Sequence, residues 1–217
     1  DEIKNRTEQG TWNLIEALIL AGITILILGN TRPVASIEHN MAHYWEMMKL
    51  MEKQKAPSHG TAVGVGTVYA LKFYEKFLET DLSSIDKAKV KQNRLSREER
   101  ERQMRECYGD SIATSIMKEN PEDFLDWDEH ERRIDAVSEN IRKIRKEMEF
   151  LPSAEKIINV MKELGAPTTA QEIGIDDELL YRTLYCSKDY RSRYTVFKTL
   201  DELGLLKGFI QEMKEGR

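Results

Sequence analysis

The stretch RPVASIEHNMAHYWEMMKLMEKQKAPSHGTAVGVGT, residues 32–67, decides the fold of this chain. It predicts a helix over 35–54, a turn over 55–58 and a second helix over 59–78, which Ser58 can cap. A turn this short makes the two helices antiparallel neighbours. No alternating apolar and polar run long enough for a strand occurs in the rest of the chain, so we predict an all-α fold.

Apolar spacing and helix breakers predict further helices on both sides of this pair, and we assign residues 1–217 to one helical domain. The charge-dense segment 83–106 is expected to be an exposed helix face or a connector. His130 is expected to be a solvent-exposed histidine near a helix start. The predicted helices cover residues 11–28, 128–150, 153–162, a segment opening at 176, and 194–203.

The predicted helix over 11–28 is apolar on both sides, so we expect it to be buried in the middle of the domain. Its most apolar part, LIEALILAGITILIL over residues 14–28, contains Glu16. That part is shorter than the roughly 20 residues needed to cross a bilayer. We therefore predict no membrane-spanning segment.

Composition limits the class of protein. The 217 residues are 40% apolar and 33% charged, as in a soluble globular protein, and the net charge of -5 gives no general reason to expect a nucleic acid partner. Residues 1–10 are charged and lack the apolar core of a signal peptide. Cys107 and Cys186 lie far apart and outside any CxxC pair, so we expect buried, reduced thiols in a cytoplasmic protein.

Three of the four histidines lie within residues 39–59. On a helix, His39, His43 and Glu46 share one face, and His59 opens the facing helix. Imidazoles from facing helices can converge on one metal ion. The spacing alone also fits separate surface or core histidines, because two histidines one turn apart are common and the HExxH zinc motif is absent.

Three glycines, Gly60, Gly64 and Gly66, fall inside the predicted helix over 59–78. A glycine inside a helix costs about 1 kcal/mol relative to alanine. Their presence predicts a close backbone approach, either to another helix or to a ligand.

Residues 32–47 and 58–67 closely resemble the metal-dependent glycerol-1-phosphate dehydrogenases, which share a superfamily with 3-dehydroquinate synthase and the iron-containing alcohol dehydrogenases. The family pattern is a Ser-Arg-Pro-Ala-Ser run, then Glu-His…Ser-His-aromatic-Trp-Glu-Met, then His-Gly…Val-Gly-Val-Gly-Thr. Thr31 and Ala42 stand where serine is usual. Residues 191–196 and 203–206 also resemble the C-terminal end of that family, so the resemblance spans about residues 11–210.

The resemblance implies a dehydroquinate synthase-like C-terminal helical domain with one divalent metal: zinc, nickel or iron. His39 and His59 would be metal ligands, and His43 would be a catalytic residue that assists the site or relays a proton near the substrate hydroxyl. Arg32 and Ser36 would contact the phosphate end of the substrate, although helix-capping or ion-pairing roles fit these two equally well. The implied reaction interconverts dihydroxyacetone phosphate and sn-glycerol 1-phosphate with NAD or NADP, in the cytoplasm, in a protein that is commonly a homodimer.

Two parts of the family pattern have no counterpart in the sequence. The third metal ligand, an Asp upstream of the first histidine, has no match, since Asp1 is the sole Asp before His39. The glycine-rich loop of the N-terminal nucleotide-binding α/β domain is also missing. We expect this chain to be inactive without that domain.

Several alternatives stay open at this stage. The chain can be a piece of a longer polypeptide, which we favour, or the product of a split gene whose partner half is a separate chain. It can also be a helical interaction domain that performs no chemistry. A further alternative keeps the superfamily but changes the substrate to another polyol or alcohol.

Overall fold

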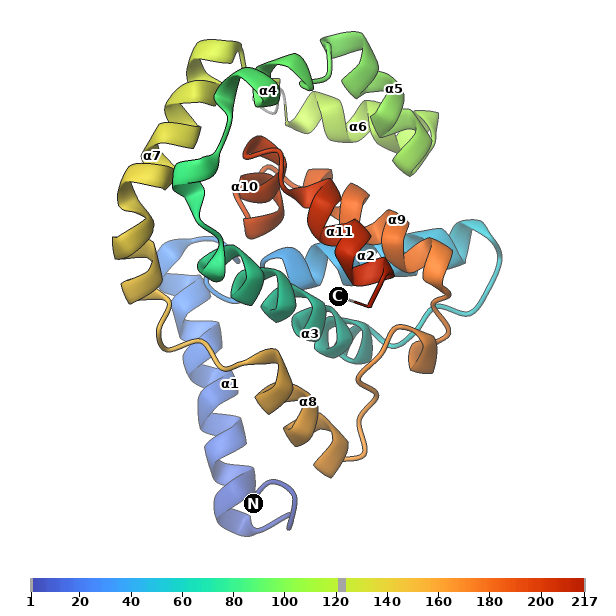
Figure 1. Ribbon diagram of the computed structural model, residues 1–217. Coiled ribbons are helices and arrows are strands. Elements are labelled where there is room, and N and C mark those ends of the chain that lie inside the picture. Colours follow the sequence, from blue (N-terminus) through green and yellow to red (C-terminus); the bar gives the residue numbers. More distant parts are fainter. Residues whose placement is uncertain (1, 121–123, 217) are drawn as a thin grey trace.

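The computed structural model describes residues 2–120 and 124–216, and every regular element among them is helical (Figure 1), which confirms the all-α prediction. The elements, in chain order, are α1 Glu8–Leu28, α2 Ile37–Met51, α3 His59–Glu79, η1 Leu82–Ser84, α4 Lys87–Gln92, α5 Arg97–Tyr108, α6 Asp110–Glu119, α7 Trp127–Glu147, α8 Ala154–Glu163, η3 Gln171–Ile173, α9 Asp177–Cys186, η4 Ser187–Asp189, α10 Val196–Glu202 and α11 Leu206–Lys214.

α2 and α3 pack against each other, as predicted, and this pair, rather than the helix over 11–28, forms the centre of the core. Large side chains on both helices are fully buried, among them Tyr44, Trp45 and Phe73. The C-terminal helices close over the pair, since Phe73 packs against Phe197 of α10 with ring centroids 4.6 Å apart. Burial of such aromatic side chains stabilises the fold more than helix propensity does.

The charged segment predicted over 83–106 is partly a connector and partly a packed helix. Ser96 and Glu99 form a capping box that starts α5. One side of α5 is solvent-exposed, as its charge predicts, and the other buries Met104, Cys107 and Tyr108. The helix therefore belongs to the core as well as to the surface.

The prediction for His130 is wrong. His130 is only 7% exposed, and its Nε2 lies 2.7 Å from the backbone carbonyl oxygen of Glu202. Its ring also packs against Trp127, with centroids 5.4 Å apart. The sequence showed a charged helix start, but α10, 72 residues later, covers this side of α7.

The prediction of reduced thiols is also wrong, although both cysteines are buried as expected. Cys107 at the end of α5 and Cys186 at the end of α9 form a disulfide, with Cα atoms 5.8 Å apart. The hydroxyl of Tyr44 donates to the carbonyl oxygen of Cys107 and that of Tyr108 to the carbonyl oxygen of Cys186, each at 2.7 Å. The pairing depends on two helix ends meeting, which a separation of 79 residues does not reveal.

We expect reduction of this disulfide to lower the free energy of unfolding by about 2–4 kcal/mol, because the bond restricts a long loop in the unfolded chain. Urea unfolding with and without dithiothreitol measures the difference. The Cys107→Ser/Cys186→Ser double variant should match the reduced protein and be insensitive to reductant. Equal stability of oxidised and reduced protein would show that the bond contributes nothing.

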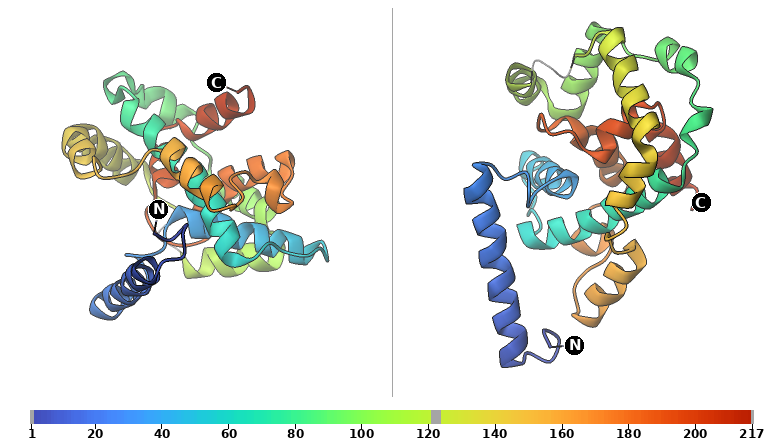
Figure 2. Two further views of the ribbon diagram at one scale, coloured as in Figure 1. Left: turned by 90° about the horizontal axis from the view of Figure 1, so that it is seen from below. Right: turned by 90° about the vertical axis from the view of Figure 1, so that its left-hand side faces the viewer.

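The position predicted for the first helix is wrong as well. α1 is 21 residues long and stands apart from the body of the molecule (Figure 2), and Gly10 is its one buried residue. It is long and apolar enough to cross a membrane. The length of residues 14–28 therefore no longer supports the prediction that no segment spans a membrane. Ten large apolar side chains of α1 are exposed. At about 1.5–3 kcal/mol for each, this helix leaves a large hydrophobic stabilisation unused.

Candidate metal and substrate site

The α2–α3 pair brings the three histidines together as predicted. His39 and His43 lie one turn apart on α2, and His59 is the first residue of α3. The ring of His59 lies between the other two, with its centroid 5.5 Å from that of His39 and 5.0 Å from that of His43. Three imidazoles therefore face one small region where the start of α3 lies against α2.

Each of these imidazoles has a carboxylate beside its Nδ1 atom. Glu38 Oε1 lies 2.9 Å from Nδ1 of His39, and Glu46 Oε1 lies 2.8 Å from Nδ1 of His59. Glu46 Oε2 is 3.4 Å from Nδ1 of His43. Among residues 2–120 and 124–216, no hydrogen bond engages the Nε2 atoms. A carboxylate on one ring nitrogen with the other nitrogen free is the usual arrangement of a metal-binding histidine.

Two sets of donor atoms in this cluster suit a metal ion. One atom each of His43, Glu46 and His59 lie within 4.8 Å of one another, which would make Glu46 the carboxylate ligand. The other set, predicted from sequence, uses His39 and His59 and leaves Glu46 to orient the His59 ring. In that second case the third ligand must come from elsewhere, and Asp1, the Asp of the N-terminal segment, lies outside the described residues.

Burial lowers the pKa of His43, and the neighbouring charges of His59 and Arg191 act in the same direction, whereas Glu46 opposes them. The net shift favours the neutral imidazole at neutral pH. A neutral imidazole can accept a proton or bind a metal, so the lowered pKa fits either role for His43.

Tyr190 and Arg191, directly after η4, form one wall of the site. These two residues were not predicted to belong to it. The ring of Tyr190 lies 5.5 Å from that of His43, and the guanidinium of Arg191 lies over the Tyr190 ring at 4.8 Å. Residues 191–196 entered the sequence analysis for family resemblance alone. Their position beside the histidines comes from the packing of η4 against α2.

Arg32 and Ser36 lie on the turn that leads into α2, a few residues before His39. Arg193 holds this turn, because its guanidinium donates to the carbonyl oxygen of Ala35 at 2.6 Å and to the side chain of Thr31. Arg32 is exposed, so its guanidinium is accessible to an anion. Ser36 precedes α2 but its side chain does not cap the helix; its backbone N–H donates to Glu38 Oε1 at 2.7 Å.

One of the three glycines brings the helices of the site into close contact. A Cβ on Gly66 would lie 2.8 Å from the backbone oxygen of Glu38, directly beside His39. Gly64 meets only the flexible end of Met161, and Gly60 has open space around it. The predicted close approach therefore holds at Gly66, and it is to a helix.

We expect Gly66→Ala to lower the free energy of unfolding by about 1–3 kcal/mol, since the added methyl group must push α2 away from α3. Gly60→Ala is the matched control in the same helix, and we expect it to be neutral or to stabilise by up to about 1 kcal/mol. Urea unfolding of both variants tests this. Equal stability of the two would contradict the close contact.

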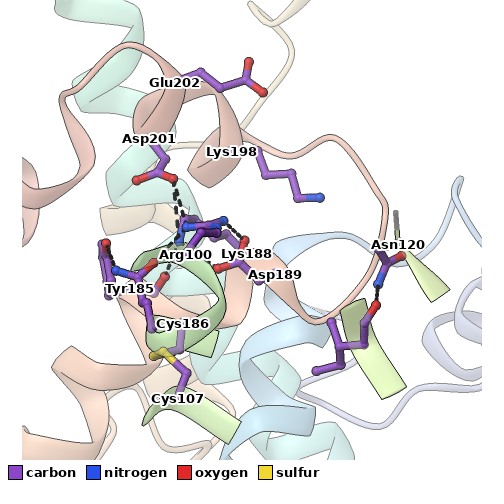
Figure 3. A network of polar contacts seen from close by, with 12 residues as sticks. Arg100, Cys107, Asn120, Tyr185, Cys186, Lys188, Asp189, Lys198, Asp201 and Glu202 are labelled. Carbon is purple, nitrogen blue, oxygen red and sulfur yellow. Dashed lines mark hydrogen bonds and ion pairs between the residues drawn. A yellow bond between two sulfur atoms is a disulfide. The ribbon is translucent and has the colours of Figure 1, made fainter. Parts of the chain in front are cut away.

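A buried ion network holds η4, the element that directly precedes Tyr190 and Arg191 (Figure 3). Lys188 and Asp189 of η4 are 1% and 2% exposed, and Nζ of Lys188 lies 2.8 Å from Asp189 Oδ2. Arg100 of α5 also pairs with Asp189, and both cations reach Asp201 of α10 at 3.6 Å. The network fixes η4, and thereby Tyr190, relative to α5 and α10.

A cavity of about 1750 Å³ is lined on one side by this network and contains none of the three clustered histidines. Basic and acidic side chains line it in similar numbers, including Arg94, Arg133, Glu129 and Asp201. The cavity and the histidine cluster are separate features of the fold.

The fold is an all-helical domain with a carboxylate-supported histidine cluster, whose donor atoms could hold a metal ion. The chain is 28% identical to a glycerol-1-phosphate dehydrogenase (NAD(P)+) of Geobacillus stearothermophilus, over 94% of this chain and 41% of that protein. It is 24% identical to the protein of the same name from Bacillus licheniformis, over 97% of this chain and 39% of that protein. Over nearly its whole length the chain is therefore similar to curated glycerol-1-phosphate dehydrogenases.

The chain spans about two fifths of the length of these curated relatives. A shorter match, 41% identical over 31% of the chain and 18% of the relative, is to the protein of this name from Aeropyrum pernix. No protein-family model and no solved structure matches the chain.

Proposed function

We propose that this chain is the metal- and substrate-binding helical domain, residues 1–217, of an NAD(P)-dependent glycerol-1-phosphate dehydrogenase. The observation that carries the proposal is the three-histidine cluster, in which a carboxylate lies beside each Nδ1 and no described residue hydrogen-bonds to the Nε2 atoms. The reaction interconverts dihydroxyacetone phosphate and sn-glycerol 1-phosphate. Most of the NAD or NADP contacts belong to the nucleotide-binding part, which is the first partner of this domain.

The donor atoms fit a divalent metal. Imidazole nitrogens and a carboxylate oxygen suit zinc, nickel or iron, and the Nδ1–carboxylate contacts preset the rings for binding through Nε2. We assign His39 and His59 as ligands. When bound, the metal polarises the substrate oxygen as a Lewis acid.

The residues of this chain have separable roles in the proposed reaction. His43, held neutral by its lowered pKa, exchanges a proton with the substrate hydroxyl. Arg32 and Ser36 bind the phosphate end, since a guanidinium suits phosphate. Tyr190 packs against the ring of His43 and restricts its orientation.

We also propose that the protein is cytoplasmic and that it forms a homodimer. Disulfides are rare in cytosolic proteins of mesophiles. A cytoplasmic location therefore requires that the Cys107–Cys186 disulfide persists in a reducing compartment. Thiol labelling of protein isolated without reductant measures the fraction of Cys107 and Cys186 that is oxidised.

The experiment that tests the function joins this chain to the part of a relative that it does not match, and measures reduction of dihydroxyacetone phosphate with NADH and NADPH. We expect metal-dependent turnover, and a loss of at least 100-fold in His43→Ala with metal content retained. Metal binding without turnover of this substrate, but with turnover of another polyol or alcohol, would favour the related dehydrogenase. No metal binding and no turnover would favour a non-catalytic helical domain.

A further inference from the structure

α1 presents apolar side chains to solvent in almost every direction. Leu18 is 64% exposed, and Gly10, the buried residue of α1, packs against the backbone of its own N-terminal turn. The exposed large apolar residues of the helix are Trp12, Leu14, Ile15, Leu18, Ile19, Leu20, Ile23, Leu26, Ile27 and Leu28. Patches of this size on soluble proteins mark interaction surfaces.

α8 extends this surface. Val160 and Leu164, at the end of α8, are each 47% exposed. An ion pair of 3.6 Å between Lys4 and Glu163 joins the N-terminal turn to the end of α8, and both helices occupy the same end of the molecule (Figures 1 and 2). We call α1 together with Val160 and Leu164 the α1–α8 apolar surface.

The polar residues of α1 favour a protein over a lipid environment. Gln9, Asn13 and Glu16 fall on one side of the N-terminal half of α1, where the Gln9 amide donates to Asn13 at 2.8 Å, and the exposed Leu20 and Ile27 continue that side in the C-terminal half. Lipid surrounds a spanning helix on all sides, and Glu16, near its middle, would place a carboxylate in the hydrocarbon. A protein can cover the apolar residues and leave Gln9, Asn13 and Glu16, in the N-terminal half, in contact with water.

The share of each relative that the chain matches indicates which polypeptide covers the α1–α8 apolar surface. The Bacillus licheniformis match takes in 210 of the 217 residues, so it includes most of α1, yet it is 39% of that relative. The relatives therefore combine this helical region with more polypeptide than the region itself contains. We infer that the α1–α8 apolar surface is a docking surface for polypeptide equivalent to the unmatched part of the relatives.

This inference rests on the proposed function, because it takes the unmatched part as the partner of the helical domain. It goes beyond that proposal by naming the surface and its apolar chemistry. Docking there places the partner beside the turn from Gly29 to Ser36, which leads from α1 into the histidine helix.

The test compares the chain alone with the chain joined to the unmatched part of the Geobacillus stearothermophilus relative. We expect backbone amides of residues 14–28 to exchange hydrogen at least tenfold more slowly in the joined protein. A photo-crosslinking residue at Leu18 should react with the added part, whereas one at Leu50, which is equally exposed at 66%, should not. His59→Ala should leave both readouts unchanged, which separates this surface from the proposed metal chemistry.

Other results would overturn the inference. These are slow exchange of α1 amides in the chain alone, α1-to-α1 cross-links in a dimer, or α1-dependent flotation with phosphatidylcholine–phosphatidylglycerol vesicles. A second measurement does not need the joined protein. Leu18→Gln/Ile19→Gln/Leu26→Gln in the chain alone should weaken binding of a hydrophobic dye without changing the near-ultraviolet circular dichroism of the protein, and undiminished dye binding would contradict the assigned surface.

Discussion

His59→Ala is expected to abolish stoichiometric binding of a divalent metal by this protein. His59 is common to both donor sets that the cluster offers, and its ring lies between those of His39 and His43. Losing it leaves donors from one helix only. Calorimetric titration with zinc, nickel and iron(II), together with metal analysis of the purified protein, measures the loss.

Two further variants decide which donor set operates. If His39 and His59 bind the metal, His39→Ala abolishes binding, and Glu46→Gln weakens it about 10–100-fold, because Glu46 then orients the His59 ring. If Glu46 is itself a ligand, Glu46→Gln abolishes binding and His39→Ala has a small effect. Glu52→Gln, at an exposed position just after α2, is the control and should bind like the unaltered protein. Metal binding that survives His59→Ala would contradict both assignments.

Asp189→Asn is expected to lower the free energy of unfolding by about 3–5 kcal/mol, because it removes one partner of a buried ion network. Lys188 is 1% exposed and would lose the carboxylate 2.8 Å from its Nζ, while Arg100 would lose its closest anion. Urea unfolding at pH 7 measures this. The control is Asp110→Asn, which breaks an exposed pair with Arg105 and should cost about 0–1 kcal/mol.

The pH dependence gives an independent check on the same residue. Burial acts to raise the pKa of Asp189, but the charges of Lys188 and Arg100 outweigh it and hold the pKa below its ordinary value of 3.8. Because the folded pKa is the lower one, the stabilisation is complete above the unfolded value and is lost as pH falls through the folded value. Below about pH 4, the unaltered protein should therefore lose more stability than Asp189→Asn. Equal pH slopes would contradict the ionised pair.

Much of the candidate site could be predicted from local patterns. Helical spacing places His39 and His43 on one face, and the short turn to Ser58 brings His59 opposite them. The same local logic fails where distant segments meet. Tyr190 contacts His43 because η4 packs on α2, and His130 is buried because α10 covers α7. Neither contact can be predicted from the residues near Tyr190 or His130 in the sequence.

The sequence by itself determined the all-helical class, the histidine hairpin and the family resemblance, because all three depend on residues close together in the chain. The tertiary structure decided the Cys107–Cys186 bond, the η4 wall and the contact of Glu46 with His59, since these depend on how separate helices meet. The tertiary structure also decided that α1 is exposed. An apolar sequence predicts that a helix is buried, because contact between apolar surface and water is unfavourable, but it does not identify the surface against which the helix packs.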